Sequence, residues 1–469
     1  MRRYHHILAV ILLLATACER QEFPMQAVQD DSSNSPAPLL VSEVGCMTRS
    51  VKDWSDAALA AMYDLPGKNG DLLGDYKPAD IINIGRSLFG QAYWQWQQHT
   101  FLYRTVDAFG KPIVLSGQMS FFADTTRQER SRIRTVSLYH LPYSVVVEDM
   151  LMTNSAVSLV RPIYGAMVVM PHGQGACYDR NNYRPHTESL LFARQDIDCE
   201  LAAMELLEQL GYKLSDDYYT ENMGISNGGT VAIAVQKLLE TTEPREVTDR
   251  IRLRATYSGE GAMDYGSNLT DLIKVAVTKP DDFHHSPICI TLSFINSLFR
   301  SHPDEFAGCV PADYFCDEFN AMTMECDGKP CSLFDAFNKG CYSADSLFEA
   351  FSITSIHQVL SKELFDSQDC LDLTHPLVKR LINAFSYNDL NGGWTPKTPI
   401  RLVHCINDSY IPYKTVRESF DKLHTLPDGS FNDNVSMKTI AHLEHVYAGI
   451  FLMLRDIVLK PHPCPVDNH

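Results

Sequence analysis

The sequence predicts an α/β protein in which helices flank a mostly parallel sheet. Strand-like apolar runs alternate with helical patterns along most of the chain, and this alternation is typical of parallel strands joined by helical crossovers. The run over 161–179 is almost continuously apolar and ends in a glycine-rich turn, as expected for a strand buried on both faces. Residues 278–390 interrupt the alternation with aromatic, cysteine-rich sequence. We therefore expect a mainly helical cap inserted between two parts of the core, 46–277 and 391–469.

The elements of the core follow from local periodicity. Residues 54–65 have the spacing of an amphipathic helix, and 103–122 alternate about a Gly-Lys-Pro turn as in a β-hairpin. Residues 132–146 predict a strand that runs into a loop, ahead of the strand in 161–179. The remaining expected elements are helices over 196–212 and 231–240, strands over 251–264, 398–412 and 435–441, and a last helix over 446–459.

Composition indicates a folded protein with a sizeable core. The chain has 469 residues, of which 45% are hydrophobic and 21% charged, so it can bury enough apolar surface for two or three structural units. The formal net charge is -18 at pH 7. Because an acidic surface repels phosphate backbones, we expect no nucleic-acid partner.

The N-terminus predicts export. An apolar run over 7–17 follows two arginines and is too short to span a bilayer, as is typical of a signal-peptide core. Small residues before Cys18 are similar to a bacterial lipobox, so we expect a lipoprotein-type signal peptide over 1–18 and a lipid anchor at Cys18. Residues 19–45, polar and rich in Pro and Ser, would be a flexible tether on the periplasmic or cell-surface side of a bacterial membrane. Ordinary cleavage after Ala17 is the alternative.

Export would place the cysteines in an oxidising compartment. Thirteen cysteines are present, and twelve would remain in the fold if Cys18 carried a lipid. Seven of them lie between residues 289 and 370, which favours disulfides in the cap, although the pairing cannot be deduced from sequence. Zinc binding is disfavoured because neither a paired C-x-x-C nor the spacing of a zinc finger occurs. We expect no metal and no cofactor.

One short motif predicts a serine nucleophile. Gly224, Ser226 and Gly228 have the spacing G-x-S-x-G, between a strand and a helix, as in a nucleophile elbow. Glycines two residues away on either side would allow a sharp bend, and the following helix would aim its positive end at the site. The N–H of Asn227, the residue after the serine, would then donate to an oxyanion. A plain turn is the alternative interpretation.

The serine needs a base and an acid, which should follow it along the chain in the order acid, then histidine. Asp408 comes directly after the strand in 398–412, although an Asx-turn is an alternative role for it. The loop after the last strand offers His442 and His445. We prefer His445 as the base and keep His442 as the alternative. A metal site at this pair with Glu444 is the weaker interpretation.

These stretches resemble the α/β-hydrolase superfamily, and within it the secretory lipase and esterase family. The resemblance covers about 100–275 and 390–460 and is carried by YRTVDAFGKP, LYHLPY, MVVMPHGQG, GISNGG, GWTPKTPIRLVHCINDSYIPY and HVYAGIF. It implies an α/β-hydrolase fold and places the insert where the family carries its lid. It also implies that the loop over 140–144 supplies the second oxyanion donor, for which we name Tyr143. The HGQG turn matches a glycine-rich turn of the family in which His172 replaces an aspartate.

The sequence therefore predicts an exported serine hydrolase that cleaves carboxylic esters through Ser226, His445 and Asp408 and an acyl-enzyme. Its substrate would be a small-molecule or polymer-linked ester. A serine peptidase of the same fold is one alternative, because esters and amides share the triad. A catalytically inactive, surface-anchored binding protein is another, against which the complete residue set argues.

Overall fold

The structure is a computed structural model. It describes residues 38–63, 79, 82–83, 86–87, 93–126, 132–141, 157–179, 182–278, 286–326, 328–339, 344–441 and 445. Cys18, the signal peptide and most of the tether lie outside the described residues, as does the last expected helix. Among the described residues, no helix has both the length and the apolar character needed to cross a bilayer.

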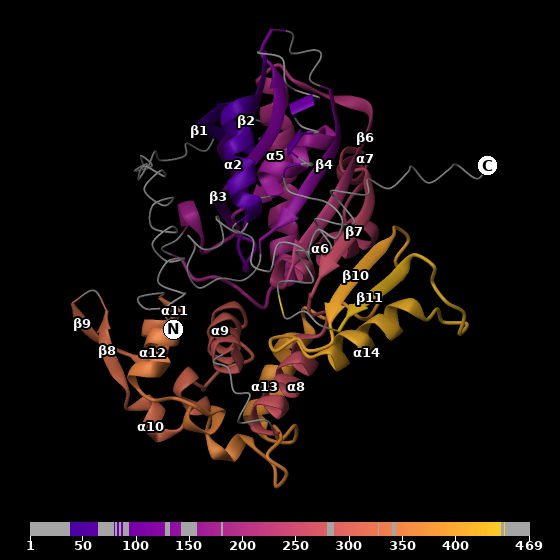
Figure 1. Ribbon diagram of the computed structural model, residues 1–469. Helices are drawn as coiled ribbons and strands as arrows, with labels where there is room; N and C mark the ends of the chain where they lie inside the picture. Colours follow the sequence, from indigo (N-terminus) through magenta and orange to yellow (C-terminus); the bar gives the residue numbers. More distant parts are fainter. Residues whose placement is uncertain are drawn as a thin grey trace. The chain divides into compact units, whose positions relative to one another are not determined.

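Nine strands form one sheet in the described chain, in the order β1-β2-β3-β5-β4-β6-β7-β10-β11 (Figure 1). The first three strands and β5 pair in antiparallel fashion, whereas β5, β4, β6, β7, β10 and β11 are mutually parallel. The strands are β1 (Leu40–Ser50), β2 (Trp94–Val106), β3 (Pro112–Asp124), β4 (Arg132–His140), β5 (Ala166–Pro171), β6 (Lys213–Ile225), β7 (Leu253–Gly259), β10 (Ile400–Cys405) and β11 (Val435–Ile440). The mostly parallel sheet expected from the sequence is confirmed.

Both faces of the sheet are buried. Met167 and Val169 of β5 belong to a hydrophobic cluster that also contains side chains of α5 and α6, whereas Val168 and Met170 belong to a second cluster that contains Trp54 of α2. Alternate residues of a strand point to opposite faces, so helices cover the sheet on both sides. The helices of the core are α2 (Val51–Tyr63), α5 (Ser189–Gln209), α6 (Asn227–Thr241), α7 (Arg245–Arg250), α8 (Tyr265–Thr278) and α14 (Tyr413–His424).

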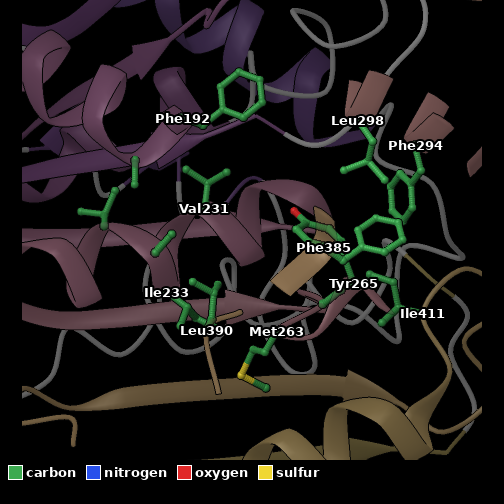
Figure 2. Packing of buried hydrophobic residues seen from close by; sticks show 14 of the residues in the cluster. Phe192, Val231, Ile233, Met263, Tyr265, Phe294, Leu298, Phe385, Leu390 and Ile411 are labelled. Carbon is green, nitrogen blue, oxygen red and sulfur yellow. The ribbon is translucent and has the colours of Figure 1, made fainter. Parts of the chain in front are cut away.

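Residues between α8 and β10 form the insert. Its described part consists mainly of helices, with one small hairpin. It shares a single hydrophobic cluster with the core: Figure 2 shows Phe294 and Phe385 of the insert packed on Tyr265 at the start of α8. Its elements are α9 (Ser286–Ser301), α10 (Asp317–Asn320), β8 (Thr323–Cys326), β9 (Lys329–Ser332), α11 (Leu333–Asn338), α12 (Ala344–Ala350) and α13 (Pro376–Ser386).

The cysteines of the insert are less cross-linked than expected. Cys326 and Cys331 form a disulfide that joins β8 to β9, whereas Cys309, Cys316 and Cys370 are thiols. The clustering of cysteines in sequence therefore did not translate into a disulfide framework in the part of the insert that the structure describes. The large hydrophobic cluster that the insert shares with the core supplies the packing that small disulfide-rich domains lack.

Several boundaries differ from the expectation. β1 begins at Leu40 and pairs with β2, so the predicted end of the tether at residue 45 falls inside a strand. This strand lies at the edge of the sheet and is largely exposed, which removes the alternation that marks a half-buried strand. Residues 161–164 form a turn of 3-10 helix ahead of β5, because Pro162 cannot donate to a sheet ladder.

Candidate active site

Ser226 stands at a sharp bend between β6 and α6. Its backbone has φ 57° and ψ -126°, a conformation that a residue with a side chain rarely adopts. The Ser226 N–H donates to the Gly259 carbonyl at the end of β7 (2.8 Å), and its own carbonyl accepts from the Thr230 N–H (3.1 Å). The backbone therefore holds the serine outside both the strand and the helix, with its side chain at the carboxyl edge of the sheet.

The two flanking glycines are required by close packing. A Cβ on Gly224 would lie 2.2 Å from the Gly228 carbonyl oxygen, and a Cβ on Gly228 would lie 2.3 Å from the carbonyl oxygen of His140 on β4. Both distances are far below van der Waals contact, so no other residue fits at either position. The spacing G-x-S-x-G thus produces a strained elbow and not a plain turn.

Three side chains from distant segments meet at this elbow. His445 Nε2 lies 2.9 Å from Ser226 Oγ, and His445 Nδ1 lies 2.7 Å from Asp408 Oδ2. Because an ionised carboxylate only accepts, Nδ1 carries the proton and Nε2 is left to accept from the serine hydroxyl. Asp408 is 9% and His445 8% exposed, so the bond between them is shielded from water, whereas Ser226 is partly exposed. This arrangement can move a proton from the serine to the imidazole.

Asp408 also shapes the loop that carries it. It follows β10, and its second oxygen, Oδ1, accepts from the N–H groups of Tyr410 (2.8 Å) and Ile411 (2.9 Å). The Asx-turn and the position beside His445 are therefore both correct. Oδ1 accepts the hydrogen bonds that shape the loop, and Oδ2 lies beside the imidazole of His445.

Electrostatics favour an ion pair between these two groups. Burial by itself would raise the pKa of Asp408, but the neighbouring His445 and the accepted hydrogen bonds bring that pKa below its ordinary value. Burial would lower the pKa of His445, yet the Asp408 carboxylate, with a further contribution from Glu260, raises it above its ordinary value. The site therefore stabilises a positive charge on the imidazole when it takes a proton.

Solved structures share this arrangement of strands and helices. A protein from Legionella pneumophila superposes with a TM-score of 0.63 and 17% identity, covering 89% of this chain and 96% of that one. The rice cell wall degrading esterase LipA from Xanthomonas oryzae gives 0.62 and 17%, covering 90% and 96%. Lipase A from Candida antarctica, in its closed state, gives 0.50 and 12%, covering 79% and 76%. The chain has an α/β-hydrolase fold. No protein-family model and no curated protein matches its sequence.

Within the α/β-hydrolase fold, the elbow places the N–H of Asn227, the expected oxyanion donor, at the start of a helix. Asn227 is the first residue of α6, and an N–H in the first turn of a helix has no carbonyl one turn earlier to bond. The Asn227 side chain is held in turn, because its Oδ1 accepts from the Tyr265 hydroxyl at 3.0 Å. Tyr143, His442 and Glu444 lie outside the described residues. Leu141, at the start of the predicted oxyanion loop, packs its carbonyl against Gly228.

The HGQG turn has a structural role in this hydrolase fold. His172 is buried at the end of β5, where its Nδ1 lies 2.8 Å from Ser116 Oγ and its N–H donates to the Ser116 carbonyl. Burial, followed by the charge of Arg184, lowers the pKa of His172 to about 4, so the ring is neutral at pH 7. A neutral histidine fits a buried position where an aspartate would carry a charge.

Two residues beside Ser226, His445 and Asp408 were not predicted from the sequence. Tyr410 stacks on the His445 ring with centroids 4.7 Å apart, and Glu260 brings a carboxylate oxygen within 4.8 Å of ligand atoms of both His445 and Asp408. Glu260 follows a strand within the run Gly-Glu-Gly, which was the one available signal. His404 on β10 is buried and donates from Nε2 to the Ile411 carbonyl (2.9 Å). Burial lowers its pKa, so it stays neutral.

Glu260, Asp408 and His445 also form a set that could in principle hold a metal ion, and so do Glu43, Cys46 and His99 on β1 and β2. In the first set, both ring nitrogens of His445 are engaged, by Asp408 and by Ser226. In the second set, Glu43 and Cys46 face different nitrogens of His99, at 2.7 Å and 4.0 Å, so they do not converge on one lone pair. Neither geometry favours a metal centre.

Proposed function

We propose that the protein is an exported serine hydrolase that cleaves carboxylic esters through an acyl-enzyme. The single observation that carries this proposal is the continuous chain of short contacts from Ser226 through His445 to Asp408, seated at a strained elbow. A serine hydroxyl becomes a good nucleophile only when a base takes its proton and a third group orients that base. These contacts supply both requirements.

The reaction would proceed in two halves. Ser226 Oγ attacks the ester carbonyl carbon while its proton passes to His445 Nε2. The tetrahedral intermediate then collapses, and the His445 proton passes to the departing alcohol. Water repeats the sequence: it gives a proton to His445 and attacks the acyl carbon, and Ser226 leaves with that proton. The Asn227 N–H would stabilise the oxyanion in both halves, together with a second donor from the loop over 140–144, for which Tyr143 is our candidate.

The proposed substrate is a carboxylic ester, either a small molecule or linked to a polymer. One protein with the same fold is described as degrading rice cell walls, and another as a lipase. Both a polymer-linked ester and a small-molecule ester are therefore reasonable substrates. The insert shares its aromatic cluster with Tyr265 of α8, which contacts Asn227, and this supports a role of the insert in selecting the acyl or alcohol group that would reach Ser226.

Hydrolysis of p-nitrophenyl esters of graded acyl length tests this function. We expect turnover by the mature protein and a loss of about 10⁴- to 10⁶-fold in Ser226→Ala, because the nucleophile is gone. A fluorophosphonate probe should label the wild-type chain at Ser226 and leave Ser226→Ala unlabelled. Equal turnover in the variant would remove the proposal, and faster cleavage of peptide amides than of esters would favour a peptidase. Absence of any probe adduct would favour an inactive binding protein.

Export and anchoring are part of the same proposal. The basic and apolar start of the chain, followed by small residues and Cys18, supports a lipid-anchored form on the periplasmic or cell-surface side. Expression in a bacterium with labelled palmitate should give a labelled protein in the membrane fraction, and Cys18→Ala should abolish the label. A mature protein that begins at Cys18 without lipid would show ordinary secretion instead.

A further inference from the structure

A second carboxylate accompanies Asp408 at the imidazole of the triad. Glu260 directly follows β7, and the carbonyl of the preceding residue, Gly259, accepts the N–H of Ser226. The Glu260 side chain is 1% exposed. Ligand atoms of Glu260, Asp408 and His445 all lie within 4.8 Å of one another. Two acidic side chains from two different strand ends therefore face one histidine.

The backbone at Glu260 is strained. Its φ is 55°, in the left-handed region that favours glycine, and its N–H donates to the Val403 carbonyl of β10 (2.8 Å). Glycines flank it on both sides, and a Cβ on Gly261 would lie 2.6 Å from the backbone of α6, so the whole turn is tightly packed. A glycine at 260 would make this turn without strain. A side chain retained there at a cost in stability points to a role of that side chain.

The surroundings of His445 indicate what that role is. The titratable or hydroxyl groups found beside it among the described residues include Asp408, Glu260, Ser226, His404 and Tyr410. His404 is neutral and its Nε2 is engaged with a carbonyl. Of these groups, only the imidazole of 445 becomes positive during proton transfer. A carboxylate within about 5 Å favours such a charge strongly when water is excluded.

We propose that Glu260 is a positioning residue that, together with Asp408, stabilises the protonated form of His445. The inference rests on the proposed function, since it concerns the base of the same site. Asp408 accepts the hydrogen bond from the Nδ1–H of His445 and so orients the ring, whereas Glu260 adds negative charge without replacing that hydrogen bond. The two carboxylates thus share one positive charge in the transition state.

The pKa of His445, followed by NMR of its ring carbon, tests this charge directly in the full mature protein. In Glu260→Gln, which keeps the shape and removes the charge, we expect that pKa to fall by about one unit. Glu260→Asp should keep it close to the wild-type value, and so should the control Glu200→Gln. Glu200 is buried on α5, where burial raises its pKa to about 8, so it carries little charge at neutral pH. An unchanged His445 pKa in Glu260→Gln overturns the proposal.

The pH–rate profile gives a second readout that a purely structural role would not produce. His445 must be neutral to accept the serine proton, so the acidic limb of kcat/KM should move to lower pH in Glu260→Gln. Its plateau should fall by up to about tenfold through kcat, with KM little changed, because the imidazolium forms only during reaction. A fall in the plateau with the acidic limb in place would mean that Glu260 acts only through structure. If no ester is hydrolysed, the proposed function fails while the NMR titration still decides this inference.

A variant that leaves Glu260 intact covers the case in which Glu260→Gln does not fold. With Asp408→Ala, we expect a loss of about 10²- to 10³-fold in kcat/KM, because one carboxylate remains beside the imidazole. Removal of the only triad acid in other serine hydrolases costs about 10⁴-fold. A loss of that size or larger in a folded Asp408→Ala protein would contradict a contribution from Glu260.

Discussion

At the scale of single residues, the site depends on backbone conformations that most side chains avoid. Ser226 and Glu260 both have positive φ, and the nearby glycines Gly224, Gly228 and Gly261 have no room for a Cβ. Strain of this kind persists only where the surrounding structure fixes it, here through the hydrogen bonds to Gly259 and Val403. The elbow is thus a local feature that the whole sheet holds in place.

Gly228→Ala tests this local packing. Its Cβ would meet the His140 carbonyl at 2.3 Å, so the elbow has to move. We expect a loss of more than about 10²-fold in kcat/KM, because displacing a nucleophile by an ångström disrupts its alignment. The melting temperature should also fall. Calorimetry and ester kinetics on the same samples measure both effects.

Gly110→Ala is the matched control for this change. Gly110 has a positive φ (72°), which Gly228 does not, but nothing lies within 4 Å of a Cβ built at Gly110. We expect a loss of about 1 kcal/mol of stability and unchanged kinetics. Equal kinetic damage in the two variants would show that crowding at the elbow does not account for the effect.

At the scale of elements, α8 connects the elbow to the insert. Tyr265, its first residue, donates to Asn227 at the start of α6 and packs against Phe294 of α9 and Phe385 of α13 (Figure 2). Burial raises the pKa of this tyrosine, so the hydroxyl keeps its proton and remains a donor. The residue proposed to stabilise the oxyanion is therefore fixed by a side chain whose own position depends on the insert.

Tyr265→Phe removes that single hydrogen bond. We expect a fall of about three- to tenfold in kcat, because the Asn227 side chain loses its hydrogen bond and the backbone N–H of Asn227 is then less firmly placed. We also expect a loss of about 1 kcal/mol in stability. Tyr314→Phe is the control: Tyr314 is also buried and donates to the Leu377 carbonyl (3.0 Å), but it lies within the insert. It should lose similar stability and keep its kcat. Urea unfolding and steady-state kinetics compare the two variants.

At the scale of the whole molecule, a buried acid joins the insert to the core. Glu188 at the start of α5 accepts from Asn388 (2.7 Å), and its other oxygen lies 2.9 Å from His302 Nε2 at the end of α9. Both partners belong to the inserted segment, whereas α5 packs on the sheet. This polar junction adds directional hydrogen bonds to the hydrophobic packing that the insert and the core share.

Glu188→Ala should therefore loosen the insert selectively. We expect faster amide hydrogen exchange in α9 and around residue 388, with protection retained in β5 and β6, because buried partners left without an acceptor favour local opening. Exchange measured by mass spectrometry distinguishes this from general destabilisation. Uniformly faster exchange in the central strands would contradict a selective role.

Much of this architecture could be predicted because its signals are local. The apolar run that contains β5, the turn between β2 and β3, and the G-x-S-x-G spacing each depend on a few neighbouring residues. Asp408 and His445 were predicted because the acid and then the histidine follow the serine along the chain in this class of motif. The rule that strand ends of a parallel sheet form ligand sites supported Asp408. Edge strand β1 was missed because an exposed strand lacks alternation.

The sequence by itself therefore determined the parallel sheet, the elbow and the residues able to form a triad, since periodicity and glycine spacing act within a few residues. Only the tertiary structure decided that Glu260 accompanies Asp408, that Tyr265 holds Asn227, and that His172 is a buried neutral partner of Ser116. Each of these contacts joins segments 38 or more residues apart. Such contacts depend on strand order and on which side chains a packed interior brings together, and no local pattern encodes either.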